Sequence, residues 1–142
     1  MSDELHLRFA EETPTPQAYN ALRKAVGWGE YDLYAIEQGL RATHYCVCAY
    51  DHEKIIGMGR IIGDNVLVFY IQDIIVLPAY QGSGIGAQIM DRIMRYIDTH
   101  AVNHSIVGLM SAVGKEGFYE KYNFVRRPTD RLGCGMTILI RE

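Results

Sequence analysis

The stretch Val76 to Met94, VLPAYQGSGIGAQIMDRIM, concentrates small residues between an apolar run and a helical pattern. Gly82, Ser83, Gly84 and Gly86 occupy the junction. The first turn of a helix presents backbone N–H groups that have no partner in the helix, together with a partial positive charge. Glycine lets the backbone come close to an anion, because no Cβ intervenes. The junction therefore predicts a site for a phosphate or pyrophosphate group.

The same glycines also fit the dinucleotide-binding pattern G-x-G-x-x-A, at Gly82, Gly84 and Ala87. That pattern requires an acidic residue about 20 positions later, at the end of the next strand. Residues 104–107 read HSIV and contain no acid. A Walker loop requires Gly-Lys-Ser or Gly-Lys-Thr after its glycines, whereas this loop continues Gly-Ala-Gln. A nicotinamide-dependent oxidoreductase therefore remains only an alternative.

Hydrophobic periodicity predicts the elements that must position this junction. Apolar alternation or continuous apolar runs predict strands at 4–12, 43–51, 54–64, 65–77, 105–110 and 135–140. Helical spacing predicts helices around 19–26, 33–40, 84–100 and 115–124. The run 65–77 is apolar at almost every position, which predicts a strand with both faces covered. This order predicts one α/β domain over residues 1–142 with a mixed sheet.

Two segments resemble the GNAT superfamily of N-acetyltransferases. Gln81, Gly84 and Gly86 fill the pattern Q/R-x-x-G-x-G/A of its acyl-CoA loop. The segment GFYEKYNF, residues 117–124, resembles the second landmark F-Y-x-K-x-G-F, with Asn123 in the place of glycine. Asparagine also tolerates the left-handed backbone conformation. The resemblance covers nearly the whole chain. It implies a single-domain GNAT-type fold, whose mixed, largely antiparallel sheet splays at the acyl-CoA site and is flanked by about four helices.

The resemblance also implies acetyl-CoA as the cosubstrate. The pyrophosphate would then be held by backbone N–H groups of six residues, Gln81, Gly82, Ser83, Gly84, Ile85 and Gly86. The pantetheine arm would pair with Ile74, Ile75 and Val76 as an additional strand would. The family often has an asparagine that touches CoA about seven residues before the motif tyrosine, and this chain has Ala112 there.

N-acetylation requires a neutral amine and a proton for the departing thiolate. Tyr119 occupies the tyrosine place of the second landmark, which implies that it is the acid. The place of the family's strand glutamate holds Tyr70, and Asp73 is the only carboxylate in the run VFYIQDIIVL. A charge in an apolar strand is costly without a partner, so Asp73 is predicted either to act on the acceptor amine or to form a structural ion pair, for which Arg60 is a candidate. Tyr70 or a bound water are alternative bases.

The segments MGRIIGD and IQDIIVLPAYQGSGIG further resemble the arylalkylamine and serotonin acetyltransferase-like branch, which implies that Asp73 lies near the acceptor amine. Trp28 lies in the break between the first two helical patterns. In the family this loop covers the acceptor pocket, so Trp28 and Tyr31, with Tyr34, are predicted to form an aromatic wall for the acceptor. Core packing is the alternative for Trp28.

Composition argues against several other classes. The formal net charge of −3 disfavours a nucleic-acid partner. No apolar run approaches the roughly 20 residues of a membrane span, and the N-terminus lacks the plan of a signal peptide. Three cysteines, Cys46, Cys48 and Cys134, are an odd number that fits a reducing, cytoplasmic compartment, and we expect neither a disulfide nor a metal site.

We therefore predict an acetyl-CoA-dependent N-acetyltransferase without a metal, which transfers an acetyl group to a small-molecule amine by direct attack in a ternary complex. A CoA-binding regulatory module that has lost catalysis is the main alternative, because Ala112 replaces a CoA contact of the family. The strand predicted at 135–140 could pair across a homodimer.

Overall fold

The structure, a computed structural model, describes residues 4–140 and divides into two compact units at Gly108 and Leu109. The strands are β1 (Leu7–Ala10), β2 (Tyr45–Asp51), β3 (Lys54–Gly63), β4 (Val68–Val76) and β5 (Ile106–Gly108). The helices of the first unit are α1 (Pro16–Ala25), α2 (Leu33–Leu40), the 3-10 turn η1 (Pro78–Tyr80) and α3 (Ile85–His100). The second unit contains α4 (Glu116–Glu120).

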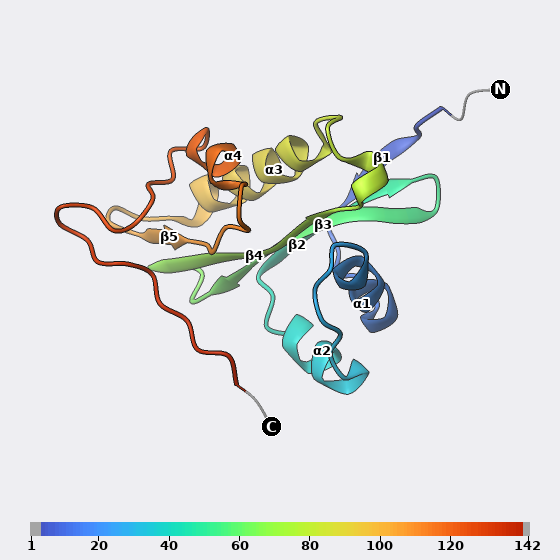
Figure 1. Cartoon of the computed structure of the whole chain (residues 1–142), viewed down its shortest axis with the longest axis horizontal. Helices are drawn as coiled ribbons and strands as arrows, with labels where there is room; N and C mark the ends of the chain where they lie inside the picture. Colours follow the sequence, from blue (N-terminus) through green and yellow to red (C-terminus); the bar gives the residue numbers. More distant parts are fainter. Residues whose placement is uncertain (1–3, 141–142) are drawn as a thin grey trace. The chain divides into compact units, whose positions relative to one another are not determined.

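The first unit is built on one five-stranded sheet in the order β1-β2-β3-β4-β5. The first four strands are antiparallel neighbours, and β5 runs parallel to β4. Helices α1 and α2 lie on one face of the sheet, and α3 lies on the other (Figure 1). The α/β fold with a mixed, largely antiparallel sheet and four α-helices is thus confirmed. A single domain over 1–142 stays a prediction.

Two apolar layers hold the helices on the sheet. Helix α3 turns five buried residues toward it, which are Ile85, Ile89, Met90, Ile93 and Ile97. On the other face, Leu22 of α1 and Ile36 of α2 belong to one buried cluster with Cys46, Met58 and Ile75 of the strands. The helical spacing read from the sequence therefore corresponds to burial, which is the main source of stability for such helices.

Capping side chains fix where α1 and α2 begin. The hydroxyl of Thr15 accepts a hydrogen bond from the N–H of Ala18 at 3.1 Å, and Pro16 follows in the first helical turn. The carboxylate of Asp32 accepts from the N–H of Ala35 at 3.0 Å. Such caps satisfy N–H groups that the helix itself leaves unpaired. The Asp32 cap also sets one end of the connection that holds Trp28.

Helix α1 contacts strand β4 from one face of the sheet and α3 contacts it from the other, which agrees with the predicted cover of both faces. Phe69, Ile71, Asp73 and Ile75 are almost completely buried, and the residues between them are half-buried. Two other expectations differ from the structure. Strand β5 ends at Gly108 and is shorter than predicted. Residues 135–140 form no strand, and their large side chains are exposed, with Ile138 at 84%. A strand needs a neighbour to pair with, which an apolar pattern alone does not supply.

Helix α3 approaches β3 closely at Gly59. A Cβ at this position would lie 2.6 Å from Cδ1 of Ile74 and 2.8 Å from atoms of Ile89 and Ile93. All three side chains belong to the packed layer between α3 and the sheet. An added Cβ would therefore force these packed side chains to shift.

The substitution Gly59→Ala tests this close approach. We expect the free energy of unfolding to fall by about 1–3 kcal/mol, because the added methyl group overpacks the interface. Urea unfolding followed by circular dichroism measures the change. Gly39→Ala in α2 is the matched control, since a Cβ there meets no atom within 4 Å; alanine in a helix is favoured over glycine by about 1 kcal/mol. Equal effects of the two substitutions would contradict the close approach.

Candidate active site

The loop between η1 and α3 leaves backbone N–H groups available to a ligand. Gly82 and Gly84 have φ values of +86° and +84°, in the left-handed region that favours glycine. Gly84 is the N-cap of α3 and makes no side-chain cap. Among the described residues, the N–H groups of 82–86 donate to no acceptor. A Cβ at Gly82 or Gly84 would meet nothing within 4 Å, so the backbone is open to close approach.

Gln81 holds this loop against the strand that precedes it. Its backbone N–H donates to the carbonyl of Pro78 at 3.3 Å, and its side-chain Nε2 donates to the carbonyl of Val76 at 2.9 Å. The N–H of Gln81 is thus engaged within the chain, unlike those of residues 82–86. In this structure Gln81 positions the loop, which differs from the expectation that its own N–H faces the pyrophosphate.

A second anchor ties η1 to the turn between β2 and β3. The hydroxyl of Tyr80 donates to a carboxylate oxygen of Asp51 at 2.7 Å, and the N–H of His6 donates to the other oxygen at 3.0 Å. These two hydrogen bonds, that of Tyr80 first, hold the pKa of Asp51 below its ordinary value. Ser83 donates to the carbonyl of Tyr80 at 2.7 Å, so the loop is braced before any ligand binds.

Strand β4 has an open edge just before the loop. Strand β5 pairs with β4 only from Val68 to Tyr70. Beyond Tyr70, no strand of the first unit lies on this side of β4. Ile74, Ile75 and Val76, the residues predicted to pair with the pantetheine arm, are in this stretch. An extended ligand can add to such an edge through main-chain hydrogen bonds.

A β-bulge interrupts β4 at Asp73. Arg60 of β3 faces Gln72, and Met58 faces Ile75, so that Gly59 alone opposes both Asp73 and Ile74. Asp73 has a φ of +58°, which aspartate tolerates better than most residues. Bulges re-aim side chains and are common beside active sites.

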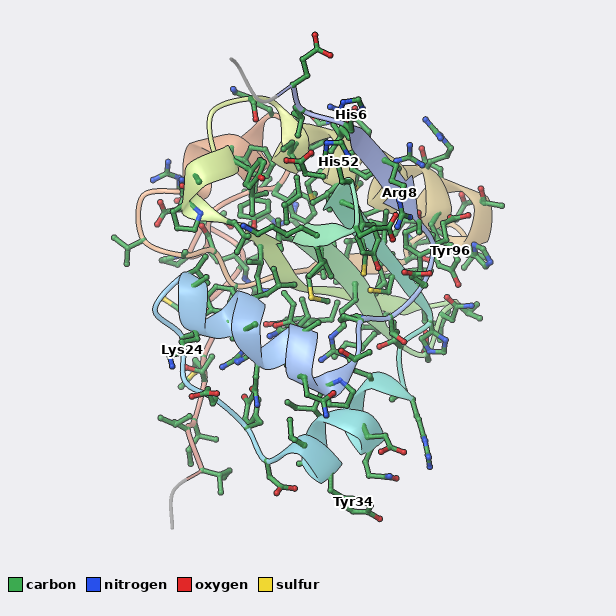
Figure 2. The ribbon with its side chains drawn as sticks, turned by 90° about the vertical axis from the view of Figure 1, so that its right-hand side faces the viewer. His6, Arg8, Lys24, Tyr34, His52 and Tyr96 are labelled. Carbon is green, nitrogen blue, oxygen red and sulfur yellow. The ribbon has the colours of Figure 1, made fainter. Side chains whose placement is uncertain are left out.

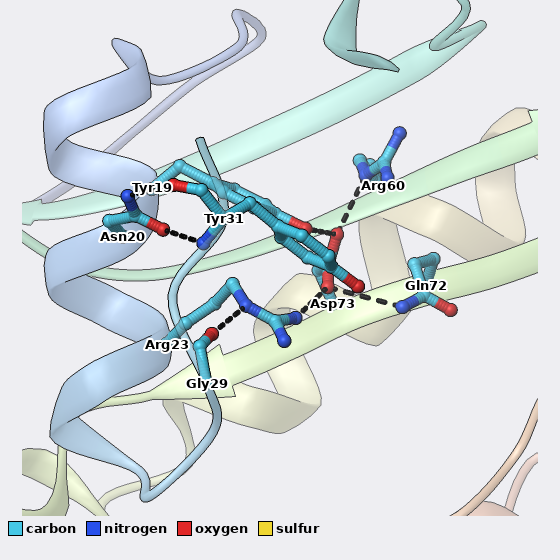
Figure 3. A network of polar contacts seen from close by, with 8 residues as sticks. All are labelled: Tyr19, Asn20, Arg23, Gly29, Tyr31, Arg60, Gln72 and Asp73. Carbon is cyan, nitrogen blue, oxygen red and sulfur yellow. Dashed lines mark hydrogen bonds and ion pairs between the residues drawn. The ribbon is translucent and has the colours of Figure 1, made fainter. Parts of the chain in front are cut away.

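The carboxylate of Asp73 is the centre of a buried polar network (Figure 3). Its residue is 3% exposed. One oxygen accepts from the hydroxyl of Tyr19 and from Nε of Arg60, both at 2.7 Å. The other oxygen accepts from Gln72 at 3.3 Å and lies 3.7 Å from Nη1 of Arg23. The ion pair predicted between Asp73 and Arg60 is confirmed.

Two tyrosines near Asp73 have raised pKa values. Burial, followed by the hydrogen bond to Asp73 and its charge, raises the pKa of Tyr19 to about 12. Tyr19 therefore stays protonated at neutral pH and acts as a hydrogen-bond donor. Burial and the charge of Asp73 also raise the pKa of Tyr70, so less of this side chain is in the phenolate form that could act as a base. Catalysis by Asp73 itself stays a prediction.

Arg23 connects the predicted aromatic residues to this network. Its Nε donates to the carbonyl of Gly29 at 2.8 Å. Its guanidinium carbon lies 4.5 Å from the ring centre of Tyr31, 5.4 Å from that of Trp28 and 5.8 Å from that of Tyr19. Trp28 and Tyr31 thus surround a cation of the protein itself, and Trp28 also packs against the core cluster.

Asn20 fixes the backbone of Tyr31, whose ring faces Arg23. Its amide oxygen accepts from the N–H of Tyr31 at 3.0 Å, and its amide nitrogen donates to the carbonyl of Tyr31 at 2.8 Å. Tyr34, by contrast, extends outward from α2 and is 70% exposed (Figure 2). The expected aromatic wall therefore does not include Tyr34.

Comparison with known proteins agrees with this geometry. Residues 17–137 match the family model of the acetyltransferase (GNAT) domain. The chain belongs to the GNAT acetyltransferase family. This family consists of acyltransferases, and the motif resemblance at 81–86 and 117–124 is confirmed at the family level.

Solved structures and curated proteins include further similar chains. A Staphylococcus aureus protein of unknown function, described as a probable acetyltransferase, is 37% identical, with a TM-score of 0.87, 94% of this chain and 99% of that one covered. A GNAT family protein from Streptococcus pneumoniae is 26% identical, with a TM-score of 0.76 and coverage of 96% and 99%. A chloroplastic GCN5-related N-acetyltransferase from Arabidopsis thaliana is 29% identical over 86% of this chain. The chain spans only 61–62% of the length of the curated relatives it matches.

Tyr119, the tyrosine of the second GNAT landmark, lies on α4 in the second unit. Its ring makes edge contacts with Phe118 and Phe124, at 5.0 and 6.3 Å between ring centres. Burial raises its pKa. Asn123 has a φ of +73°, which confirms the left-handed position predicted in this landmark.

Two of the three cysteines lie on strand β2. Cys46 and Cys48 are buried free thiols, and the Sγ of Cys48 donates to the carbonyl of Glu12 at 3.2 Å. Across residues 4–140, no three His, Cys, Asp or Glu side chains are grouped so as to hold a metal ion. The described helices are also too short or too polar to cross a membrane.

Sequence reasoning missed Tyr19, Asn20 and Arg23, which all lie on α1. A signal was present, because Tyr19 and Arg23 are four residues apart and share a helix face with Leu22. A basic residue on the apolar face of a helix indicates a buried partner. The partner itself, Asp73, is 50 positions later and could not be paired with Arg23 from spacing.

The substitution Asp73→Asn tests how far the GNAT fold depends on this network. It keeps the size and the tolerated backbone conformation but removes the charge that balances two buried guanidinium groups. We expect the free energy of unfolding to fall by about 3–5 kcal/mol, as when one partner of a buried ion pair is removed. Urea unfolding measures the loss. Asp98→Asn on the exposed side of α3 is the control, with a change within about 0.5 kcal/mol.

Activity of the same variant separates structure from chemistry. If Asp73 acts on the acceptor amine, kcat/KM of the folded variant should drop and recover partly at high pH, where more free amine is neutral. A large loss of stability with normal kcat/KM would assign Asp73 to structure alone.

Proposed function

We propose that this chain is an acetyl-CoA-dependent N-acetyltransferase that transfers an acetyl group to the amine of a small molecule. One observation carries the proposal: a glycine loop with open N–H groups at the start of α3 directly follows the unpaired edge of β4. The two features together suit a ligand with a pyrophosphate and an extended amide-bearing arm. Acetyl-CoA has both, and a GNAT protein from Brucella melitensis with the same fold was solved in complex with it.

Each part of the site then has a defined task. The N–H groups of residues 82–86 bind the pyrophosphate, and Gln81 and Tyr80 keep the loop in place. Ile74, Ile75 and Val76 align the arm along β4. Acetyl-CoA supplies the acetyl group as a thioester, so the chain only has to orient it and to manage protons.

Tyr119 is suited to protonate the departing thiolate. Burial raises its pKa, which keeps the phenol protonated at neutral pH and ready to donate. The amine nitrogen attacks the thioester carbonyl directly, the C–S bond breaks, and the proton lost by the amine goes to a base. A water held by the strand or Asp73 fills that last role. In this ternary mechanism no acetylated residue forms.

Ligand titration tests the proposal against its alternatives. Acetyl-CoA at about 100 times its Kd should stabilise the protein by about 2.7 kcal/mol in a thermal-shift assay, and NAD should not. Release of CoA thiol with a panel of amines then separates an enzyme from a regulatory module. The module alternative rests on Ala112 and predicts binding without turnover. Stabilisation by NAD alone would instead support the oxidoreductase.

A cytoplasmic location and a homodimer remain predictions. Neither is needed for the chemistry proposed above. Size-exclusion chromatography with light scattering measures the second. The measurement is motivated by Met136, Ile138 and Ile140, whose large apolar side chains are exposed and could be covered by a second copy of the chain.

The substitution Gly84→Ala tests the loop. An alanine at φ +84° is strained, and its methyl group enters the space that the pyrophosphate must occupy. We expect the Kd for CoA to rise at least tenfold, measured by calorimetry. Gly27→Ala is the matched control, since Gly27 has a φ of +83° and equally open surroundings but lies between α1 and α2. It should lower Tm to a similar extent with unchanged CoA affinity; equal Kd values for both variants would refute the loop assignment.

The substitution Tyr119→Phe tests whether Tyr119 protonates the departing thiolate. It keeps the ring contacts and deletes the proton donor, so kcat should fall by roughly 10²-fold with little change in the KM for acetyl-CoA. The raised pKa also predicts that the wild-type kcat declines only above the ordinary tyrosine pKa of 10.0, and that this limb is absent from the variant. Tyr34→Phe, at an exposed ring, serves as the control. A wild-type kcat and pH profile for Tyr119→Phe would leave Tyr119 a packing residue.

A further inference from the structure

The buried network around Asp73 has an unbalanced charge. Two guanidinium groups, those of Arg23 and Arg60, face the single carboxylate of Asp73. Both arginine side chains are only 12% exposed, and that of Asp73 is 0% exposed. No second carboxylate contacts either arginine among residues 4–140. Guanidinium groups stay charged in proteins, so the cluster carries one net positive charge at neutral pH.

The two arginines also have donors to spare. Each guanidinium group offers five N–H donors in a plane. The acceptors in hydrogen-bond geometry are Asp73, the carbonyl of Gly29 and the hydroxyl of Thr43. These engage only part of the donors. No buried side-chain nitrogen among the described residues lacks a partner, so the remaining donors reach the surface. An additional anionic oxygen could accept from these donors and would balance the charge of the cluster.

The aromatic residues beside the cluster do not favour a cationic ligand. The rings of Trp28 and Tyr31 already face the guanidinium group of Arg23. A second cation would be repelled by Arg23 and Arg60, and the same repulsion lowers the pKa of an amine bound nearby.

The cluster lies beside the strand edge assigned to acetyl-CoA. Asp73 directly precedes Ile74, the first residue of that edge. An acceptor whose amine reaches the thioester would thus have its remaining groups within range of the arginines. We infer that the acceptor carries a carboxylate as well as its amine, and that Arg23 and Arg60 bind this carboxylate. This inference rests on the proposed function and names the substrate class of the same site.

Paired acceptors test the inference with the wild-type protein. Each pair has an ω-amino acid and the plain amine of equal chain length, such as 4-aminobutanoate and butylamine, because a distant carboxylate hardly alters the basicity of the amine. With acetyl-CoA present, kcat/KM is measured from the release of CoA thiol. In the pair that reacts fastest, the amino acid should show a kcat/KM at least tenfold higher than that of the plain amine. Plain amines that react as fast as the acids would overturn the inference while leaving the acetyltransferase proposal intact.

A variant then assigns the effect to a residue. Arg23→Met keeps an apolar stem against the rings and removes the charge. The kcat/KM for the amino acid divided by the kcat/KM for the plain amine should fall at least tenfold, with the Kd for CoA unchanged. Arg41→Met, at an exposed arginine of α2 paired with Glu37, is the control and should change none of these values. A uniform loss for both acceptors would indicate a structural role and overturn the assignment.

A binding measurement tests the carboxylate site without turnover. 3-Phenylpropanoate and 3-phenylpropanol differ only in the carboxylate, and both lack an amine. The acid should raise the Tm of the wild-type protein and the alcohol should not, and Arg23→Met should abolish the difference. Equal shifts for the two compounds would refute the carboxylate site. Failure of the proposed function would appear separately, as no stabilisation by acetyl-CoA.

Discussion

The ion pair between Asp73 and Arg60 is the interaction on which the site depends. It joins the bulge of β4 to β3, and through Tyr19 and Arg23 it joins both strands to α1. These side chains are buried, so their contacts with one another must replace the hydrogen bonds that they would otherwise make to water. The position of α1 sets the connection that holds Trp28 and Tyr31. One carboxylate thus links α1 to two strands of the sheet, in addition to the apolar cluster that packs α1 and α2 on the same face.

The other features of the site all lie on strand β4 or directly follow it. Its pairing with β5 stops early, its bulge aims Asp73 toward α1, and its end leads into the glycine loop. Hydrogen bonds from Gln81 and Tyr80 hold that loop before a ligand is present. A preformed loop loses little conformational freedom on binding, which favours affinity.

Local features were predictable from the sequence, and long-range ones were less so. The glycine loop and α3 follow from contiguous residues whose helical face and backbone freedom are visible in the chain. The pairing of Asp73 with Arg60 was predictable because both interrupt apolar strands. Arg23 was not, since its partner depends on how α1 packs. The strand expected at 135–140 is absent, because apolar alternation specifies a face but not a neighbour.

The positive φ of Asp73 has a consequence for how this strand can be mutated. Most side chains raise the energy of a left-handed residue by about 1–2 kcal/mol, whereas asparagine is among the few that do not. An alanine scan along β4 would therefore report, at residue 73, the sum of a lost carboxylate and a strained backbone. At Ile71 or Ile75 the same scan reports side-chain loss alone. The effects of alanine substitution at different points of β4 are thus not comparable. A large loss of activity or stability at residue 73 would not by itself show that Asp73 takes part in catalysis.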